Sequence, residues 1–250
     1  MELIPLKTPH QIKTMRAGGQ ITALILDQLF RSVRSGVTTR QLEEQADQLL
    51  RQHPVKPAFK DFEGYRYNLV TCVNEEVVHG IPSPRALEDG DLLTIDFGTI
   101  YQGWYTDMAR TQIVGSAKSD RKQFLEVGRT ALDRAIQECR PGRRIGDIGH
   151  AIQSTIESAG YGVVRMYVGH GVGKIMHEPP QIPGFGLPHH GPELKTGMVL
   201  AVEVMYTMGD YRLEILDDGW TAVTKDRSLS AMFEHTVAVT DAGPQVLTTS

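Results

Sequence analysis

The sequence is poor in cysteine, in long apolar runs and in excess charge of either sign. Cys72 and Cys139 are its two cysteines among 250 residues, which excludes a disulfide framework and a cysteine-rich zinc module. No run of about 20 apolar residues occurs, so a membrane span is not expected. The formal net charge of −4 provides no basic footprint for nucleic acid. The N-terminus lacks the apolar core of a secretory signal, so a cytoplasmic protein is expected.

What is present is an ordinary globular composition with many potential metal ligands. Hydrophobic residues make up 40% of the chain and charged residues 22%, close to the averages of soluble proteins. A length of 250 residues allows two ordinary domains or one large domain with a substantial core. The 9 His and 30 Asp and Glu residues leave room for a metal site with nitrogen and oxygen ligands. Their grouping along the chain therefore decides the function.

Periodicity and capping residues predict helices in pairs, with strands after each pair. Thr8 and Thr38 each precede a glutamine by three residues, which is typical of a capping box. The predicted helices cover residues 8–35, 38–53, 119–140 and 147–159. The predicted strands cover residues 68–79, 92–98, 104–114, 163–168, 198–206, 211–216, 220–224 and 231–240. Residues 177–192 are rich in proline and glycine and are expected to form a loop.

This repeated order of elements suggests an internal duplication. Residues 90–96 (GDLLTID) parallel residues 197–203 (GMVLAVE), and each segment has a carboxylate six residues after its glycine. The expected helix-ending glycines, Gly36 and Gly142, are separated by nearly the same length of chain as these two segments. Coincidence between two buried strands is the alternative. Spacing and element order agree independently, so we favour duplication.

Two aspartates, Asp96 and Asp107, lie on the two strands of a predicted hairpin. If the chain turns at Tyr101–Gln102, they face each other with their Cβ atoms about 4.5–5.5 Å apart. Two buried like charges at that distance are unfavourable unless one is protonated or a cation lies between them. Solvated positions on an exposed face are the alternative, although the apolar residues beside Asp96 favour burial.

Two glutamates occupy strands of the second half. Glu203 lies in the middle of the otherwise apolar residues 198–206, and Glu234 lies between two apolar segments. Such a carboxylate is costly to leave unpaired, although a salt bridge could satisfy either one. Four such carboxylates, two in each half, favour a shared cation over four separate salt bridges.

Three histidines are placed to complete such a site. His170 stands between two glycines and offers a nitrogen donor, although a single buried histidine is more often structural. Four carboxylates with one imidazole suit two divalent ions, and two-metal hydrolysis is the chemistry that this set favours. His79 and His177 could be ordinary surface residues. If they line the pocket, they could hydrogen-bond the substrate and stabilise a developing oxyanion.

Several motifs occur together in a specific order. The most specific is the GHGVG segment at residues 169–173 followed by His177, and the VHGIP segment at residues 78–82 after Asn74–Glu75 is nearly as diagnostic. The others are Gly90–Asp91, Ile95–Asp96, Asp107, Glu203, the KDRSLSA segment at residues 225–231 and Glu234–Thr236. By these motifs the sequence resembles, nearly from end to end, the type I methionine aminopeptidases of the pita-bread fold family.

The resemblance implies an α+β pita-bread fold. Its pseudo-twofold, duplicated α/β halves would form a curved, mainly antiparallel sheet that helices cover on one face. The chain would be one catalytic domain over residues 1–250, with halves at about 1–114 and 115–250. The implied activity is removal of the N-terminal methionine from peptides and nascent chains, with preference for a small second residue. The enzyme would be a cytoplasmic monomer acting near the ribosome, without nucleic-acid or membrane partners.

The resemblance also implies a metal site with two divalent ions per subunit, which could be Co, Mn, Fe or Zn. Asp96 would bind one ion, and His170 and Glu203 would bind the other. Asp107 and Glu234 would bridge both. Glu203 would also shuttle the proton during hydrolysis of the first peptide bond.

The remaining site residues are implied to contact the substrate. His177 would hydrogen-bond the carbonyl oxygen and His79 the scissile amide nitrogen. Tyr65, Met176 and Trp220 stand where similar enzymes line the methionine pocket, and an aromatic lining suits a thioether. A hairpin aromatic packed on the sheet is the alternative for Trp220.

The sequence departs from the family pattern at two positions near the expected pocket. Val70 stands where relatives often have cysteine, and Gly184 replaces an asparagine or histidine. Both departures leave the five expected metal ligands in place. They therefore bear on the rim of the pocket and on the side-chain preference.

Two other functions share part of this pattern. An aminopeptidase for Xaa-Pro bonds would have the same five ligands, but such relatives usually carry a large additional N-terminal domain. A non-catalytic binding relative would be expected to lose ligands and to gain basic tails. All five ligands are present and the net charge is −4, which favours the methionine-specific enzyme.

Overall fold

The first two helices begin at the predicted threonines. In each capping box the threonine hydroxyl accepts the amide N–H of the glutamine three residues later, and the glutamine side chain accepts the threonine N–H. Thr8 caps α1 (Pro9–Ser32) and Thr38 caps α2 (Thr39–Leu50). Both helices end about three residues before their predicted ends, and α2 gives way to a turn ahead of Pro54.

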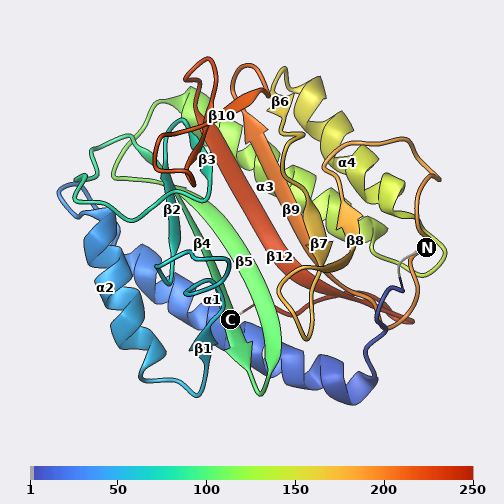
Figure 1. Ribbon diagram of the computed structural model, residues 1–250. Helices are drawn as coiled ribbons and strands as arrows, with labels where there is room; N and C mark the ends of the chain where they lie inside the picture. The colour runs from blue at the N-terminus through green and yellow to red at the C-terminus, as the bar shows by residue number, and fades with distance from the viewer. Residues whose placement is uncertain (1–2, 250) are drawn as a thin grey trace.

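The structure is a computed structural model that describes residues 3–249 (Figure 1). Besides α1 and α2, these residues form the helices α3 (Ser119–Glu138) and α4 (Ile145–Ser158). Its strands are β1 (Lys56–Pro57), β2 (Val70–Val73), β3 (Glu76–Val78), β4 (Leu92–Tyr101), β5 (Trp104–Ile113), β6 (Gly162–Val163), β7 (Gly169–Gly171), β8 (Glu178–Ile182), β9 (Val199–Thr207), β10 (Leu213–Ile215), β11 (Ala222–Thr224), β12 (Ser230–Thr240) and β13 (Gly243–Val246). In the described residues, no helix is long and apolar enough to cross a membrane.

Most of the strands form two large sheets that meet at β5 and β12, and β10, β11 and β3 form a separate small sheet. The first contains β1, β2, β4 and β5, and the second has the order β13-β12-β9-β7-β8 with β6 beside β9. All the strand pairs of these sheets are antiparallel. Helix α1 packs behind β4 and β5, and α3 packs behind β9 and β12 (Figure 1). The opposite face of the central strands is left for a site.

The two halves repeat each other in detail. Gly36 has a φ of 84° and donates its N–H to Leu87 O, and Gly142 has a φ of 85° and donates to Leu194 O. Glycine adopts such a left-handed conformation with little strain, and each glycine lies in the turn three residues after a helix C-cap, at Val33 and at Cys139. Each half also has its own apolar core between its helix pair and its strands. The duplication expected from the sequence is present in the fold.

Two predicted segments differ from the structure. Residues 163–168 were expected to be a strand, but β6 contains just Gly162–Val163. Residues 177–192 were expected to be a loop, but they include β8 with Pro179 and Pro180. Proline lacks a backbone N–H and is tolerated on an edge strand, and β8 is the edge of its sheet.

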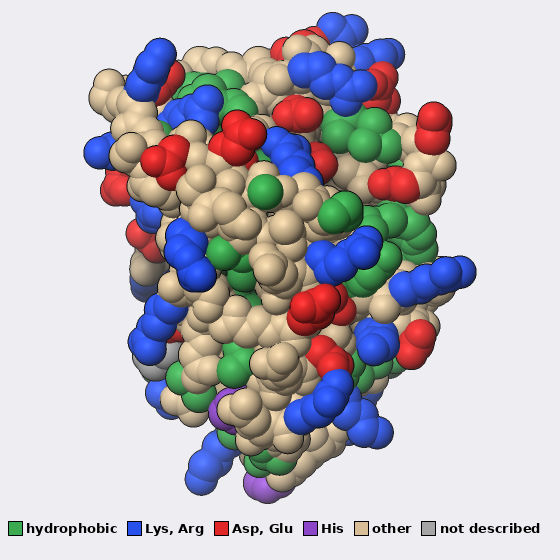
Figure 2. Space-filling model, turned by 90° about the vertical axis from the view of Figure 1, so that its left-hand side faces the viewer, with side chains coloured by type: hydrophobic (Ala, Val, Ile, Leu, Met, Phe, Trp, Pro, Cys, Tyr) green, Lys and Arg blue, Asp and Glu red, His purple; other side chains and the backbone are tan. Residues whose placement is uncertain are grey.

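Charged side chains of both signs are interspersed on the molecular face in Figure 2. Lys and Arg alternate with Asp and Glu there, and no single sign dominates. This mixture of signs is in line with the small net charge of −4.

Candidate metal centre

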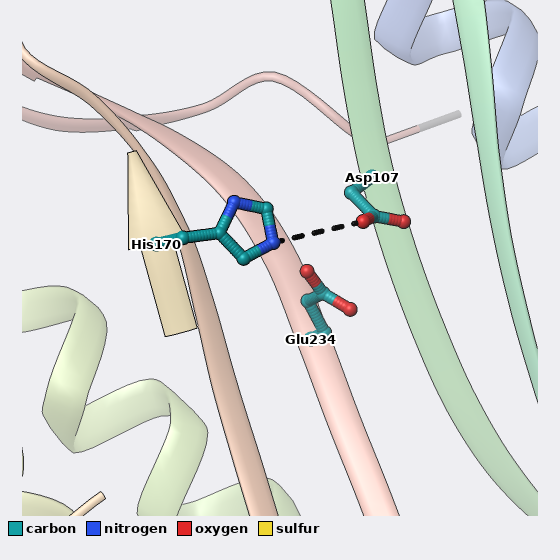
Figure 3. Close-up of side chains that lie close together, drawn as sticks. All are labelled: Asp107, His170 and Glu234. Atoms are coloured by element: carbon teal, nitrogen blue, oxygen red, sulfur yellow. Dashed lines mark ion pairs between the residues drawn. The ribbon is translucent and has the colours of Figure 1, made fainter. Parts of the chain in front are cut away.

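Three side chains from both halves converge where the two sheets meet (Figure 3). Asp107 comes from β5, His170 from β7 and Glu234 from β12. One ligand atom of each lies within 4.8 Å of the other two, and His170 Nε2 is 4.0 Å from Asp107 Oδ2. All three residues are buried. Neither half could assemble this group alone.

The hairpin that carries the two aspartates turns one residue later than predicted. Gln102 and Gly103 form the turn, both with positive φ, as a two-residue hairpin turn requires. Asp96 therefore pairs with Ala109 rather than with Asp107. The expectation that the two aspartates oppose each other directly is wrong. They lie diagonally on the same face, where long side chains and ligands can still join them.

The two glutamates, in contrast, oppose each other directly. Glu203 on β9 is the register partner of Glu234 on β12. Residues directly opposite on an antiparallel pair have Cβ atoms about 4.5–5.5 Å apart, so two charges there repel. The sequence placed both on strands but did not predict this pairing. The two carboxylates of the second half are therefore direct register partners, whereas those of the first half are diagonal neighbours.

The four carboxylates cannot all be ionised in their surroundings without a cation. Burial raises the pKa of Asp107 to about 7. Burial and the charge of Asp107 raise the pKa of Glu203 to about 8. Burial and the neighbouring carboxylates raise the pKa of Asp96 and of Glu234 well above the usual range. Asp96 Oδ1 and Glu234 Oε1 are buried and have no hydrogen-bond partner. The residues therefore suit a divalent cation.

His170 presents a metal-binding nitrogen to this group. Its Nδ1 lies 2.9 Å from Gly171 O, and a carbonyl can only accept, so Nδ1 carries the proton. The lone pair is then on Nε2, the atom that faces Asp107. Burial, together with the nearby His177, lowers the pKa of His170 to about 4, which keeps the ring neutral. A neutral imidazole fixed through its other nitrogen is the usual form of a metal ligand.

The carboxylates and His170 line a cavity of about 1520 Å³. All ten sequence-predicted site residues line it: Tyr65, His79, Asp96, Asp107, His170, Met176, His177, Glu203, Trp220 and Glu234. The His177 ring lies 4.4 Å from the His170 ring and nearly perpendicular to it. The structure therefore brings the expected metal ligands, the two further histidines and the expected methionine pocket into one space.

His79 reaches this cavity from a strained backbone position. Its φ of 60° lies in the left-handed region, which is uncommon for a residue other than glycine. The next residue, Gly80, leaves no room for a side chain, because an added Cβ would lie 2.2 Å from Thr71 O. Strain of this kind, about 1–3 kcal/mol, persists where the surrounding structure enforces it and is concentrated at functional sites.

Aromatic rings form one wall of the cavity. The rings of Tyr65 and Trp220 meet edge to face at 5.1 Å, and Met176 is buried beside them in the same apolar cluster. The Tyr65 hydroxyl lies 2.8 Å from Leu69 O and 2.9 Å from Gly80 O, which fixes the ring. The contact between Trp220 and Tyr65 places Trp220 at the cavity rather than on the far side of the sheet.

Three aromatic residues of this cavity were not predicted from the sequence. Phe59, Phe62 and Tyr167 line it, and the Phe62 ring lies 5.3 Å from the His177 ring. Tyr167 meets His79 edge to face at 5.0 Å. The signal was available in part, because residues 59–67 (FKDFEGYRY) hold four aromatic residues in a short segment.

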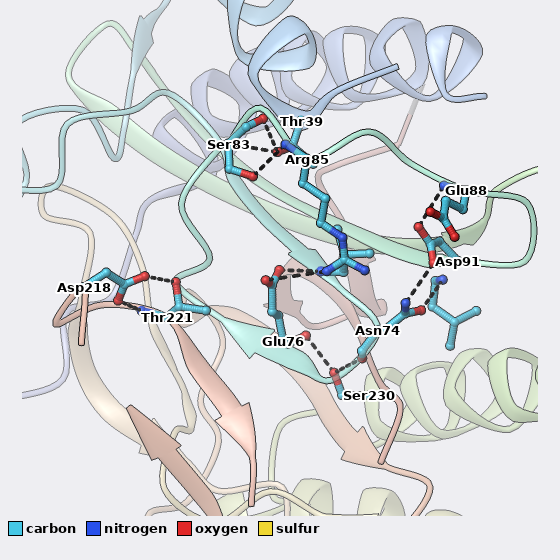
Figure 4. A network of polar contacts seen from close by, with 12 residues as sticks. Thr39, Asn74, Glu76, Ser83, Arg85, Glu88, Asp91, Asp218, Thr221 and Ser230 are labelled. Carbon is cyan, nitrogen blue, oxygen red and sulfur yellow. Dashed lines mark hydrogen bonds and ion pairs between the residues drawn. The ribbon is translucent and has the colours of Figure 1, made fainter. Parts of the chain in front are cut away.

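Motif residues outside the cavity join the halves through a polar network (Figure 4). Asn74 Nδ2 donates to Asp91 Oδ1 at 2.8 Å, and Asn74 Oδ1 accepts the Leu92 N–H at 3.0 Å. The Ser230 N–H donates to Asn74 O at 2.8 Å. The network therefore connects the start of β4 with the start of β12, the strands that carry Asp96 and Glu234.

Known proteins are similar to this chain in sequence and in fold over nearly its whole length. Residues 13–241 match metallopeptidase family M24. Methionine aminopeptidase 1 of Bacillus subtilis is 44% identical over 246 residues, which cover 98% of this chain and 99% of that protein. The crystal structure of a methionine aminopeptidase from Thermotoga maritima has a TM-score of 0.97 and 43% identity, covering 99% of this chain and 100% of that one. A prolidase from Pyrococcus furiosus, at 24% identity and a TM-score of 0.80, shares the fold, and this chain covers 65% of it.

The fold and the buried ligand group define a metallopeptidase, and the chain belongs to metallopeptidase family M24. Within that family, relatives that match its full length at about the same size include methionine aminopeptidases of Bacillus subtilis, Clostridium acetobutylicum and Thermotoga maritima. The α+β pita-bread fold expected from the motifs is confirmed, and so is the type I resemblance. The use of divalent metal follows from the family and from the buried group.

Proposed function

We propose that this protein removes the N-terminal methionine from peptides and newly made proteins by hydrolysing their first peptide bond. The observation that carries the proposal is one cavity lined by a buried carboxylate and imidazole group, two further histidines and an aromatic wall. Relatives named methionine aminopeptidases match the chain from end to end, which supports the same activity. The whole of residues 1–250 acts as one catalytic domain, because the cavity takes residues from both halves.

The metal centre in this proposal holds two divalent ions. Asp96 would hold one ion, His170 and Glu203 would hold the other, and Asp107 and Glu234 would serve both. An oxygen-rich set with one imidazole is compatible with Mn, Fe, Co or Zn. When bound, such ions polarise the scissile carbonyl and lower the pKa of water. The partnerless oxygens of Asp96 and Glu234 support ligation at both ends of the group.

Three side chains carry out the proton transfer and polar contacts. Glu203 accepts the proton of the attacking water and returns it to the leaving amine. His177 donates a hydrogen bond to the carbonyl oxygen as negative charge develops there, and His79 contacts the amide nitrogen. Desolvation lowers the pKa of His79 and of His177, so both rings are neutral at neutral pH. Each can then present one N–H donor and one acceptor.

The methionine side chain occupies the aromatic wall of the cavity. Tyr65, Met176 and Trp220 form the pocket, where a flexible thioether contacts ring edges favourably. Val70 is buried in the same cluster and adds an apolar surface. The second residue of the substrate is small, and the substrates include nascent chains near the ribosome. The protein acts as a monomer in the cytoplasm.

Peptide hydrolysis tests this function directly. The Mn²⁺-loaded protein is expected to release Met from Met-Ala-Ser and to cleave Met-Lys-Ser far more slowly. A chelator should abolish the reaction. Faster hydrolysis of Ala-Pro than of Met-Ala peptides would identify an Xaa-Pro enzyme instead. Absence of any bound divalent ion in protein purified anaerobically without chelator would favour a non-catalytic binding relative.

A further inference from the structure

Threonine hydroxyls join the two halves beside the metal centre. β5 and β12 belong to different sheets but lie next to each other, and we call their contact the seam. Thr236 Oγ1 accepts the Asp107 N–H at 2.9 Å and donates to Asp107 O at 2.8 Å. Thr111 Oγ1 makes the same pair of bonds with Met232, at 2.8 Å to its N–H and 2.9 Å to its carbonyl. Each hydroxyl thus takes the place of a peptide group in a strand ladder.

Both hydroxyls donate and accept hydrogen bonds within the protein, and that of Thr111 uses its full capacity. A hydroxyl has one proton to donate and two lone pairs to accept with. Thr111 donates to Met232 O, so the contact of 2.7 Å with Thr94 Oγ1 has Thr94 as its donor. Thr94, Thr111 and Thr236 are at most 2% exposed. Water cannot replace these bonds, so each peptide group of the seam depends on its threonine.

The hydroxyl bonds lie at one expected metal ligand, Asp107, and on both sides of another, Glu234. Asp107 is the residue whose own peptide group Thr236 holds. Glu234 lies midway between Met232 and Thr236, the two seam positions of β12. The separation between the Asp107 and Glu234 carboxylates is therefore set across the seam. It is not fixed within either sheet, since each sheet holds just one of them.

We propose that Thr111 and Thr236 are positioning residues that hold Asp107 and Glu234 at the spacing needed for divalent ions. This inference rests on the proposed metal-binding role of those two carboxylates. Each half has its own core, so a weaker seam changes the distance between the ligands without unfolding either half. Partners of this kind typically alter metal affinity about 10- to 100-fold.

Substitution of Thr236 separates the hydroxyl from the shape of the side chain. In Thr236→Val the side chain keeps its branching but leaves the Asp107 N–H and C=O buried and unpaired. We expect Mn²⁺ to bind the metal-stripped variant about 10- to 100-fold more weakly in titration calorimetry. Thr236→Ser keeps the hydroxyl and should bind within about threefold of the wild type. Thr111→Val and Thr111→Ser repeat the test at a residue that bonds no ligand directly.

A matched control lies outside the seam. Thr224 on β11 is also fully buried, and its hydroxyl donates to Ser228 O at 2.7 Å. Thr224→Val should lose stability but keep the Mn²⁺ affinity of the wild type. Equal loss of affinity in the Thr224 and Thr236 variants would overturn the proposal, because the effect would then be a general one of buried hydroxyls.

The remaining outcomes are also decisive. A folded Thr236→Val protein with unchanged Mn²⁺ affinity refutes the positioning role and leaves the proposed function intact. If that variant does not fold, Thr111→Val decides, and unchanged affinity there refutes the proposal. Failure of the wild-type protein to bind Mn²⁺ refutes the metal site itself, which is the failure of the proposed function.

Discussion

Two sets of buried carboxylates in this molecule are stabilised in different ways. Glu178 forms an ion pair with Lys7, and the two side chains are just 5% and 3% exposed. Asp96 and Glu234 are equally inaccessible, yet each keeps an oxygen without a hydrogen-bond partner. Burial of a carboxylate is thus no sign of a metal by itself. Several buried carboxylates that share one place and lack a protein partner are such a sign.

Removal of a carboxylate from the unpaired set should have the largest effect. Asp107→Asn and Glu234→Gln remove one charge from each half. Each is expected to lower kcat/KM for a Met-Ala-Ser peptide by at least about 10³-fold. Both variants lose a carboxylate proposed to hold the metal, and loss of the metal should cost more than the roughly 10²–10⁴-fold that acid–base catalysis contributes alone. If either variant kept near-normal activity, the two halves would not contribute equally to the site.

Disruption of the Lys7–Glu178 ion pair should lower the free energy of unfolding instead. Lys7→Met leaves the Glu178 charge buried without its partner, which typically costs about 3–5 kcal/mol of unfolding free energy. Urea denaturation measures this loss, which should be similar with and without Mn²⁺. The double variant Lys7→Met/Glu178→Leu removes both charges and should recover most of the stability. A loss that appeared only in the metal-loaded protein would contradict this distinction.

Substitution of a cavity histidine separates metal binding from substrate contact. His177→Ala should lower kcat by about 10²–10³-fold, as loss of one oxyanion donor does. Its Mn²⁺ affinity should stay within about threefold of the wild type, because the proposed role of His177 is a contact with the substrate carbonyl and not with the metal. A large fall in Mn²⁺ affinity would instead indicate that His177 is a metal ligand.

Metal removal should make stability depend on pH above neutrality. The folded pKa values of Asp107 and Glu203, about 7 and 8, lie above their usual values, so their contribution is present at low pH and is lost as pH rises through those values. His79, His170 and His177 have lowered pKa values, so their contribution changes only below about pH 6.5.

From pH 6.5 to pH 8, the chelator-treated protein should therefore lose on the order of 1–2 kcal/mol of unfolding free energy. The Mn²⁺-loaded protein should not, because its carboxylates stay ionised throughout. Urea denaturation at both pH values, with and without Mn²⁺, measures the difference. The same fall in both samples would mean that the four carboxylates do not share a cation.

Local signals in the sequence predicted the helices and the duplicated plan. Thr8 with Gln11 and Thr38 with Gln41 act within one turn of chain, so the capping boxes could be recognised without a fold. The hairpin turn was misplaced by one residue because Gln102 adopts a positive φ of 50°, which its residue type does not favour. Strand β8 was missed because its prolines are acceptable only at an edge, and edges are a property of the whole sheet.

The residues of the candidate site could be predicted from the sequence, but their arrangement in space could not. Buried carboxylates stood out because they interrupt apolar strands, and the motifs supplied their expected roles. The register of Glu203 with Glu234 depends on pairing across the intervening β10 and β11, which no local pattern fixes. Lys7 and Glu178 are 171 positions apart, and the residues around either one do not predict their ion pair.

The Thr236 contact also sets an order of events during folding. The peptide group of Asp107 obtains its hydrogen bonds from a hydroxyl that lies 129 residues further along the chain. Contacts of such sequence separation form late, because a long loop must close first. We therefore expect Asp107 to reach its final surroundings after each half has collapsed onto its own helices. Hydrogen–deuterium exchange at the Asp107 amide would measure how often the contact between β5 and β12 opens, and the measurement needs no substrate.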